Sequence, residues 1–152
     1  MVDTDYMRLA IEAAWKGLKQ GEAPFGACVV KEGRVVAVVH NMARRTWDIT
    51  AHAEVQAIRE ACRKLKTLDL SGSALYTSCE PCPMCFSACC WAKIPKVVYG
   101  ARIEDAERLG IRQIPIDSAR MKQMSRWPVE LTGDVLRAES VELLEAWPRK
   151  GS

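Results

Sequence analysis

Short apolar runs alternate along this chain with longer segments in which apolar residues recur every three or four positions. The short runs are typical of strands and the longer segments of helices. We expect strands at 27–30, 34–40, 74–77, 96–99 and 129–132. We expect helices at 4–19, from an N-cap at Thr50 to about Leu65, at 83–92, at 104–109 and at 140–147.

This order of elements predicts an α/β fold in which helices cover both faces of one sheet. The turn signal Glu32-Gly33 makes the first two strands an antiparallel hairpin. Strands joined through helices should run parallel, by right-handed crossovers. We therefore expect a three-layer α/β/α sandwich around a central mixed sheet of about five strands. The predicted buried face of the helix that follows Thr50 consists of Ala51, Val55, Ile58, Cys62 and Leu65.

The length of 152 residues suits one domain, residues 1–152, in which 133–152 form a C-terminal helical tail. No run of 18 apolar residues is present, so we expect no membrane span. The acidic start Met1–Asp5 lacks the basic and apolar pattern of a secretory signal, which predicts a cytoplasmic protein. The net charge of +3, with both signs scattered, does not indicate extensive phosphate binding.

Two short motifs each follow a predicted strand and open a predicted helix. His52-Ala53-Glu54 opens the second helix, and Pro81-Cys82-Pro83-Met84-Cys85 opens the third. In a layered α/β domain, the helix starts that follow parallel strands gather at one edge of the sheet. One histidine and two cysteines can therefore meet at one point. Most of the seven cysteines lie between Cys79 and Cys90, which favours a metal or catalytic role over a disulfide scaffold.

The set of His52, Cys82 and Cys85 has the composition of a catalytic zinc site. Such sites use three protein ligands and leave the fourth position to water, whereas structural sites close all four. We therefore expect one Zn²⁺ per subunit with a bound water or hydroxide. Glu54 lies two residues after a ligand, where it can carry protons between that water and a reacting group without binding the metal.

These motifs resemble those of the cytidine deaminase-like superfamily of zinc deaminases. The resemblance runs from the first helix to about Gly110. The stretches Ala-Pro-Phe-Gly-Ala at 23–27, Thr-Ala-His-Ala-Glu at 50–54 and Leu-Tyr-Thr-Ser-Cys-Glu-Pro-Cys-Pro-Met-Cys at 75–85 are most similar to bacterial guanine deaminases and plant guanosine deaminases. The resemblance implies hydrolytic deamination of a nucleobase or nucleoside, with His52, Cys82 and Cys85 as zinc ligands and Glu54 as proton shuttle.

The same resemblance implies substrate contacts and an assembly. Asn41, at the end of the second strand, would hydrogen-bond the substrate, and Phe25, Ala53 and Trp91 would lie near the base. Packing in the core remains the alternative for Phe25 and Trp91. Because the enzymes that resemble this chain are oligomers, we expect a homodimer that acts on a small-molecule nucleobase or nucleoside.

The similarity weakens after the fourth predicted helix. Guanine deaminases of this type carry Gly-Phe-Asp-Asp there, and the acidic pair helps to grip and protonate the purine. This chain has Gly110-Ile111-Arg112-Gln113 instead, and its segment 145–148 resembles the family's site-closing tail only loosely. Conversion of guanine to xanthine and ammonia is the expected reaction, with cytosine, a triazine or another aminopurine as alternative substrates.

An iron–sulfur protein is a competing interpretation. Cys79, Cys82, Cys85 and Cys89 have the C-x₂-C-x₂-C-x₃-C spacing of bacterial ferredoxins. The proline expected after the fourth cysteine is absent, and the histidine and glutamate of the first motif are left without a role. Cys89 lies one helical turn after Cys85, so it can instead pack as a small residue near the site.

A tRNA adenosine deaminase is a further interpretation, since that branch shares both motifs. Arg44, Arg45 and Trp47 are suited to contact phosphate and to stack on a base, although a solvated loop accounts for the same residues. That branch more usually carries Leu and Val at the positions of Cys79 and Pro83. A binding module that has lost catalysis is disfavoured, because all the residues of the proposed chemistry are present.

Overall fold

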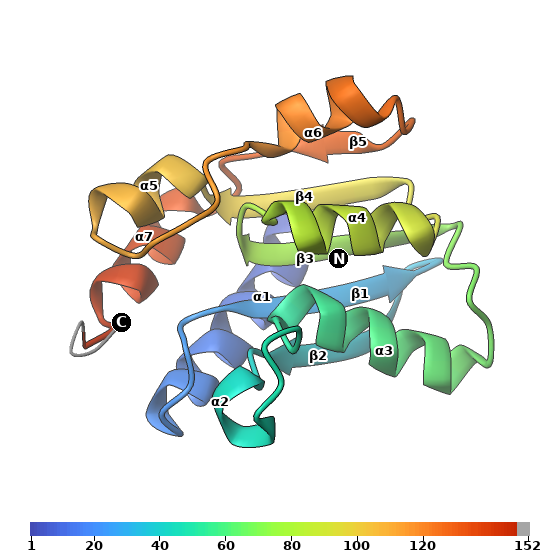
Figure 1. Ribbon diagram of the computed structural model, residues 1–152. Coiled ribbons are helices and arrows are strands. Elements are labelled where there is room, and N and C mark those ends of the chain that lie inside the picture. The colour runs from blue at the N-terminus through green and yellow to red at the C-terminus, as the bar shows by residue number, and fades with distance from the viewer. Residues whose placement is uncertain (149–152) are drawn as a thin grey trace.

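The computed structural model describes residues 1–148 and contains one five-stranded sheet (Figure 1). Its strands are β1 (Gly26–Lys31), β2 (Arg34–His40), β3 (Ser73–Cys79), β4 (Lys96–Ala101) and β5 (Glu130–Thr132). The order across the sheet is β2-β1-β3-β4-β5. β1 is antiparallel to both β2 and β3, whereas β4 runs parallel to both β3 and β5. The mixed sheet and its leading hairpin are therefore confirmed.

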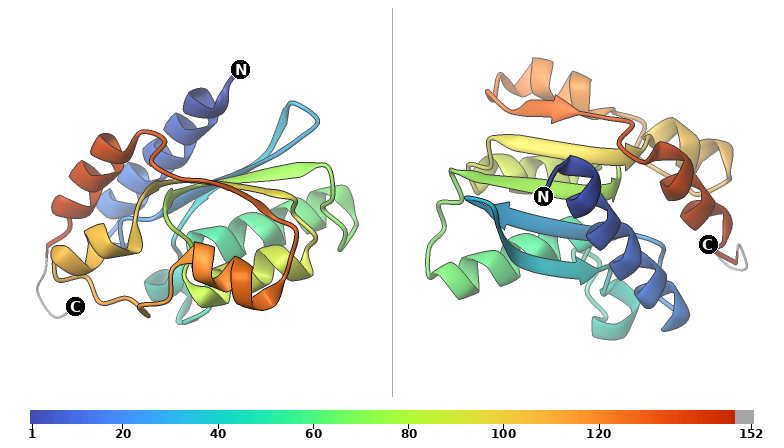
Figure 2. Two further views of the ribbon diagram at one scale, coloured as in Figure 1. Left: turned by 90° about the horizontal axis from the view of Figure 1, so that it is seen from above. Right: turned by 180° about the vertical axis from the view of Figure 1, so that it is seen from behind.

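Helices cover both faces of the sheet, which confirms the three-layer sandwich (Figure 2). They are α1 (Asp3–Lys19), α2 (Ala43–Thr46), α3 (Ala53–Leu65), α4 (Pro83–Trp91), α5 (Ile103–Arg108), α6 (Ser118–Ser125) and α7 (Arg137–Glu145). α3 and α4 pack side by side on one face with α6 beside α4, and α1 and α7 lie on the other face. No helix within residues 1–148 combines the length and the apolar character needed to cross a lipid bilayer.

The core between the sheet and α3 pairs small side chains on the helix with larger ones on the strands. Ala53, Ala57 and Ala61 are fully buried on α3, and Leu75 and Val97 are fully buried on β3 and β4. The distance at which a helix packs depends on the side chains at the contact, so alanines let α3 lie close to the sheet. This packing brings the first turn of α3 into the interior.

The buried face of α3 differs from the predicted one. Val55, Ile58 and Cys62 are half-buried, and Leu65 is 37% exposed. Of the predicted face only Ala51 is fully buried, and it precedes the helix. The sequence carries two apolar stripes on this helix, and the stripe of alanines faces the sheet because it fits the narrow space there.

The other differences concern polar segments. Apolar periodicity predicts neither α2 nor α6, because α2 has no buried residue and α6 buries only Ser118. α6 begins at a polar cap, where the Asp117 carboxylate accepts a hydrogen bond from the Arg120 N–H at 2.8 Å. The prediction that Thr50 caps α3 is wrong: its hydroxyl donates to Asp48 Oδ1 at 2.6 Å, and His52 takes the N-cap position.

The predicted last helix, 140–147, corresponds to α7, which runs from 137 to 145 and packs against β4 and α1. The end of the predicted C-terminal tail, residues 149–152, lies outside the described part of the chain. The assignment of residues 1–152 to a single domain stays a prediction.

Candidate metal and catalytic site

The site lies where α3 and α4 begin, next to each other on one face of the sheet (Figure 1). His52 is the N-cap of α3 and Cys82 is the N-cap of α4, both with extended backbone. Pro83 occupies the first turn of α4, where its missing N–H costs no hydrogen bond. Neither N-cap side chain caps its own helix, so both are free to bind elsewhere.

The ligand atoms of His52, Cys82 and Cys85 all lie within 4.8 Å of one another. His52 Nδ1 is 3.7 Å from Cys82 Sγ and 3.5 Å from Cys85 Sγ. A tetrahedral centre with the bond lengths usual for zinc separates a ligand nitrogen from a ligand sulfur by about 3.6 Å. One imidazole nitrogen and two sulfurs at these distances therefore fit Zn²⁺. The predicted ligand set comes together as one group.

Hydrogen bonds within this group set its protonation. A hydrogen bond from the Cys85 thiol, with a further one from His52, lowers the pKa of the Cys82 thiol to about 4. The contact with Cys82 raises the pKa of His52, and it raises that of Cys85 far above its ordinary value. The lowered pKa favours the thiolate form of Cys82, which is the form in which cysteine binds a metal ion.

Glu54 lies beside the ligands, in the first turn of α3. It is 6% exposed, and its burial, together with the neighbouring Cys82 thiolate, raises the pKa of Glu54 to about 7. A carboxyl group that titrates near neutrality can both accept and donate a proton, as a general acid–base catalyst must.

A pocket of about 40 Å³ adjoins the ligand group. Its walls are Phe25, His52, Glu54, Cys79, Glu80, Cys82 and Gln113. Phe25 thus lines the pocket, as the resemblance implies. Glu80 and Gln113 were not among the predicted site residues: Glu80 stands within the cysteine motif, and Gln113 arrives on a loop whose path depends on tertiary packing. Cys79 is buried in the wall, at 3% exposure.

Asn41 and Ala53, the next two predicted substrate contacts, are both buried. Asn41 is 5% exposed and donates its backbone N–H to Phe25 O at 2.9 Å, while its Oδ1 accepts from Ala43 N at 2.8 Å. Ala53, which stands between His52 and Glu54 in the sequence, is fully buried. Roles of Asn41 and Ala53 in substrate binding stay predictions.

Trp91 does not lie at the pocket of its own chain. It is the last residue of α4 and is 80% exposed, whereas the metal ligands are at the start of that helix. Eight residues of helix separate it from Pro83, which corresponds to about 12 Å. Within one chain, Trp91 therefore neither contacts a base in the pocket nor packs in the core.

The four-cysteine interpretation does not describe the site. Within residues 1–148 the group that can hold a metal contains His52 together with Cys82 and Cys85, and it omits Cys79 and Cys89. Cys89 is 1% exposed and packs in the core beside α4. The donor set is therefore the histidine and two thiols of a zinc centre.

Comparisons with known proteins agree with this geometry. The family model of the cytidine and deoxycytidylate deaminase zinc-binding region matches residues 1–101. A guanine deaminase from Bacillus subtilis (strain 168) is 38% identical over 146 residues, which cover 93% of this chain and 91% of that protein. A tRNA-specific adenosine deaminase from Aquifex aeolicus (strain VF5) is 35% identical over 136 residues, which cover 86% and 89%.

A solved structure of a guanine deaminase from Nitrosomonas europaea superposes with a TM-score of 0.85 at 30% sequence identity. The match covers 93% of this chain and 81% of that one. The shared fold and the ligand group therefore support the same family assignment.

Proposed function

Because the chain belongs to the cytidine and deoxycytidylate deaminase zinc-binding family, we propose that it deaminates a free nucleobase, guanine, to xanthine and ammonia. Water adds to the ring carbon that bears the amino group, the carbon–nitrogen bond breaks, and the ring keeps the oxygen as a carbonyl. The observation that carries this proposal is the small pocket that Glu54 lines together with His52 and Cys82, beside the group of His52, Cys82 and Cys85.

The residues divide the chemistry between them. His52, Cys82 and Cys85 would hold the zinc, which would serve as a Lewis acid and lower the pKa of a bound water toward neutrality. Glu54 accepts a proton from the attacking water and passes it to the ring nitrogen beside the reacting carbon. It then carries a second proton to the leaving amine, because ammonia leaves readily only when protonated. The buried position of Glu54 keeps these protons away from bulk water.

The lining of the pocket favours a flat ring system as the substrate. A volume of about 40 Å³ is close to that of one water molecule in the liquid, so the space beside the ligand group suits the attacking water. Phe25 offers an aromatic wall for such a ring. The similarity to a guanine deaminase over nearly the whole chain supports guanine among the possible bases.

A tRNA adenosine deaminase is the second candidate, and one exposed segment favours it. Trp47 is 95% exposed and lies five residues before His52, at the end of α2, which carries Arg44 and Arg45. Exposed aromatic rings next to arginines are common where proteins bind single-stranded RNA. The similarity to a tRNA-specific adenosine deaminase is comparable to that of the guanine deaminase.

One screen separates the two candidates. The zinc-loaded protein is incubated with guanine, guanosine, cytosine, cytidine, adenine, adenosine, an aminotriazine and an RNA stem-loop with an unpaired adenosine, and ammonia or inosine is measured. Guanine is expected to give the highest kcat/KM, and the RNA no inosine. Inosine formation in the RNA without turnover of any base would establish the second candidate, and no ammonia from any compound would refute the first.

A further inference from the structure

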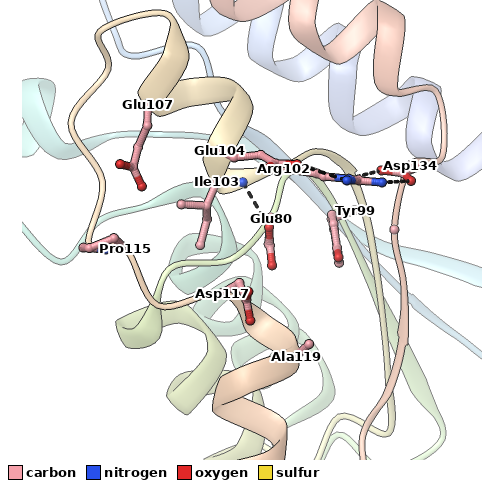
Figure 3. A pocket seen from close by; sticks show the side chains of 11 residues that line it. Glu80, Tyr99, Arg102, Ile103, Glu104, Glu107, Pro115, Asp117, Ala119 and Asp134 are labelled. Carbon is pink, nitrogen blue, oxygen red and sulfur yellow. Dashed lines mark hydrogen bonds and ion pairs between the residues drawn. The ribbon is translucent and has the colours of Figure 1, made fainter.

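Glu80 is a buried carboxylate that belongs to two cavities at once. It lines the metal pocket and also a larger cavity of about 560 Å³ on the other side (Figure 3). It is 6% exposed and stands two residues before the ligand Cys82. The proposed reaction does not use this carboxylate, so its burial within the site requires another explanation in terms of its contacts.

The Glu80 carboxylate joins the starts of two helices. Oε1 accepts a hydrogen bond from the backbone N–H of Ile103, the first residue of α5, at 3.0 Å. Oε2 accepts from the backbone N–H and the hydroxyl of Ser118, the first residue of α6, at 2.8 and 2.6 Å. Figure 3 shows the carboxylate between α5 and the chain that leads into α6. Glu80 therefore connects the metal-binding motif with the start of α5 and with the start of α6, where the segment between the two helices ends.

That segment includes a strap, defined as residues 112–116, which is held only at its ends. A buried residue lies close to each end: Ile111 is 4% exposed and donates its N–H to Ala106 O at 2.9 Å, and Ser118, two residues after the strap, is fully buried against Glu80. Within residues 1–148 no hydrogen bond joins the strap to any other part of the molecule. The bond from Ser118 to Glu80 therefore fixes where the strap ends.

The strap supplies one wall of the metal pocket through Gln113. The Gln113 Nε2 donates to Arg112 O at 3.0 Å, and its Oε1 has no hydrogen-bond donor among the described residues. An amide oxygen of this kind can accept a hydrogen bond from an N–H of a bound heterocycle. The position of this group relative to the reacting ring depends on the strap, and hence on Glu80.

We propose that Glu80 is a positioning residue: by holding Ser118 it keeps the strap over the metal pocket, so that Gln113 completes the wall around the substrate. This inference rests on the proposed deamination as far as the substrate is concerned. The placement of the strap can be measured without any substrate. The proposed function and the proposed role of Glu80 can therefore be tested separately.

Limited proteolysis tests the placement without any substrate. Arg112 offers trypsin a cleavage site within the strap, and mass spectrometry follows cleavage of the Arg112–Gln113 bond. Glu80→Gln keeps one accepting oxygen and loses the other, so one of the two helix starts is released. We expect cleavage at this bond to accelerate at least tenfold, with the zinc content unchanged.

Glu22→Gln provides a matched control. Glu22 is also a buried glutamate, 1% exposed, and it accepts the backbone N–H groups of Arg44 and Arg45 at 3.1 and 2.8 Å. This variant is expected to loosen α2 and to leave cleavage after Arg112 at the wild-type rate. Ser118→Ala removes a single hydrogen bond and should accelerate cleavage less than Glu80→Gln; wild-type cleavage in both variants would overturn the proposal.

Steady-state kinetics test the consequence for the substrate. With the best base from the screen, Glu80→Gln is expected to raise KM about tenfold and to change kcat much less, because the lost interaction is one of substrate binding. Gln113→Ala should raise KM in the wild-type background and add less than twofold to Glu80→Gln, since both changes act through one contact.

Independent, additive effects of Glu80→Gln and Gln113→Ala on KM would overturn the link between the two residues. If the wild-type protein turned over no compound of the screen, the proposed function would fail, while the proteolysis result would still decide where the strap is held.

Discussion

A single carboxylate has to move every proton of the proposed reaction. Glu54 reaches the pocket from the first turn of α3 and is almost completely shielded from solvent. Within the pocket the only other carboxylate is Glu80, whose two oxygens are occupied by Ile103 and Ser118. Proton transfer therefore depends on Glu54 alone among the residues that line the pocket.

Replacement of this carboxylate tests the assignment. Glu54→Gln keeps the size of the side chain and removes its ability to take up a proton, so kcat is expected to fall by about 10²–10⁴-fold. Zinc content by elemental analysis and the circular dichroism spectrum should match the wild type. Full ammonia release by this variant would refute the role of Glu54 as proton shuttle.

The two histidines of the chain allow a controlled test of the metal site. His52→Ala removes one of three ligands and is expected to lower the zinc content after dialysis to well below one ion per chain. His40→Ala serves as the control, since His40 Nδ1 lies 2.7 Å from Asn41 O and the residue is outside the ligand group. Equal zinc in the two variants, measured by elemental analysis, would contradict the ligand assignment.

Residues at short, fixed spacing could be identified from the sequence, and those that depend on a loop path could not. His52 and Glu54 stand two residues apart, and Cys82 and Cys85 one helical turn apart, so each pair shares one helix start. Gln113 reaches the pocket only because the chain after α5 crosses the site. No local pattern encodes that crossing.

Among the elements, α5 and α7 are joined by a buried ion pair. Asp105 is fully buried and accepts two hydrogen bonds from Arg137, at 2.9 and 2.8 Å, and one from Arg108 at 2.8 Å. Its second oxygen also accepts the Arg102 backbone N–H at 2.8 Å. The hydrogen bonds from Arg137 hold the pKa of Asp105 well below its usual range.

This ion pair predicts a pH dependence of stability. Because the pKa of Asp105 is lower in the folded chain than its value of about 3.9 in the unfolded chain, its contribution is complete above about pH 5. The contribution is lost as the pH falls below 4. Urea unfolding between pH 6 and pH 3 is expected to show a steeper loss of stability in the wild type than in Asp105→Asn.

The Asp105→Asn variant should also be less stable at pH 6, by about 2 kcal/mol, because charge-assisted hydrogen bonds are replaced by neutral ones. At pH 3 the two proteins should approach one another. If the free energies of unfolding of the two proteins changed equally between pH 6 and pH 3, Asp105 would not contribute to the pH dependence of stability.

At the level of elements, sequence patterns predict the strands and the long helices correctly, but they do not predict which face of α3 is buried. α3 carries a stripe of alanines and a stripe of larger residues, and only packing decides which of them meets the sheet. α6 is amphipathic only weakly and is defined by the cap at Asp117. Hydrophobic periodicity finds elements that are buried along one side, and α6 is not such an element.

At the scale of the whole molecule, apolar side chains are exposed on α3 and at the end of α4. A groove of about 640 Å³ is lined by Ile58, Cys62 and Leu68 together with three basic residues and a threonine. Trp91 is 80% exposed at the end of α4, a helix that contains no charged residue. Large exposed apolar surfaces are typical of protein interfaces. The homodimer stays a prediction, and Trp91 is the exposed residue that we expect to lie in its interface.

Light scattering at micromolar concentration tests that assembly. The wild-type chain is expected to have twice the mass of one chain, and Trp91→Glu is expected to shift the protein to monomers, because a charge in an apolar interface is costly. Lys19→Glu, on the opposite face of the sheet, makes a comparable surface change and should leave the dimer intact. A monomeric wild type would contradict the prediction of a homodimer.

The strap between α5 and α6 has a consequence for how such an enzyme can change. The hydrolytic groups come from two helices anchored in the core, whereas one wall of the metal pocket comes from Gln113, in a strap of five residues that make no hydrogen bonds with the remainder of the described chain. Substitutions among those five residues leave the anchored helices untouched. A lineage can therefore acquire a new substrate by mutation in one short loop while inheriting its hydrolytic apparatus unaltered.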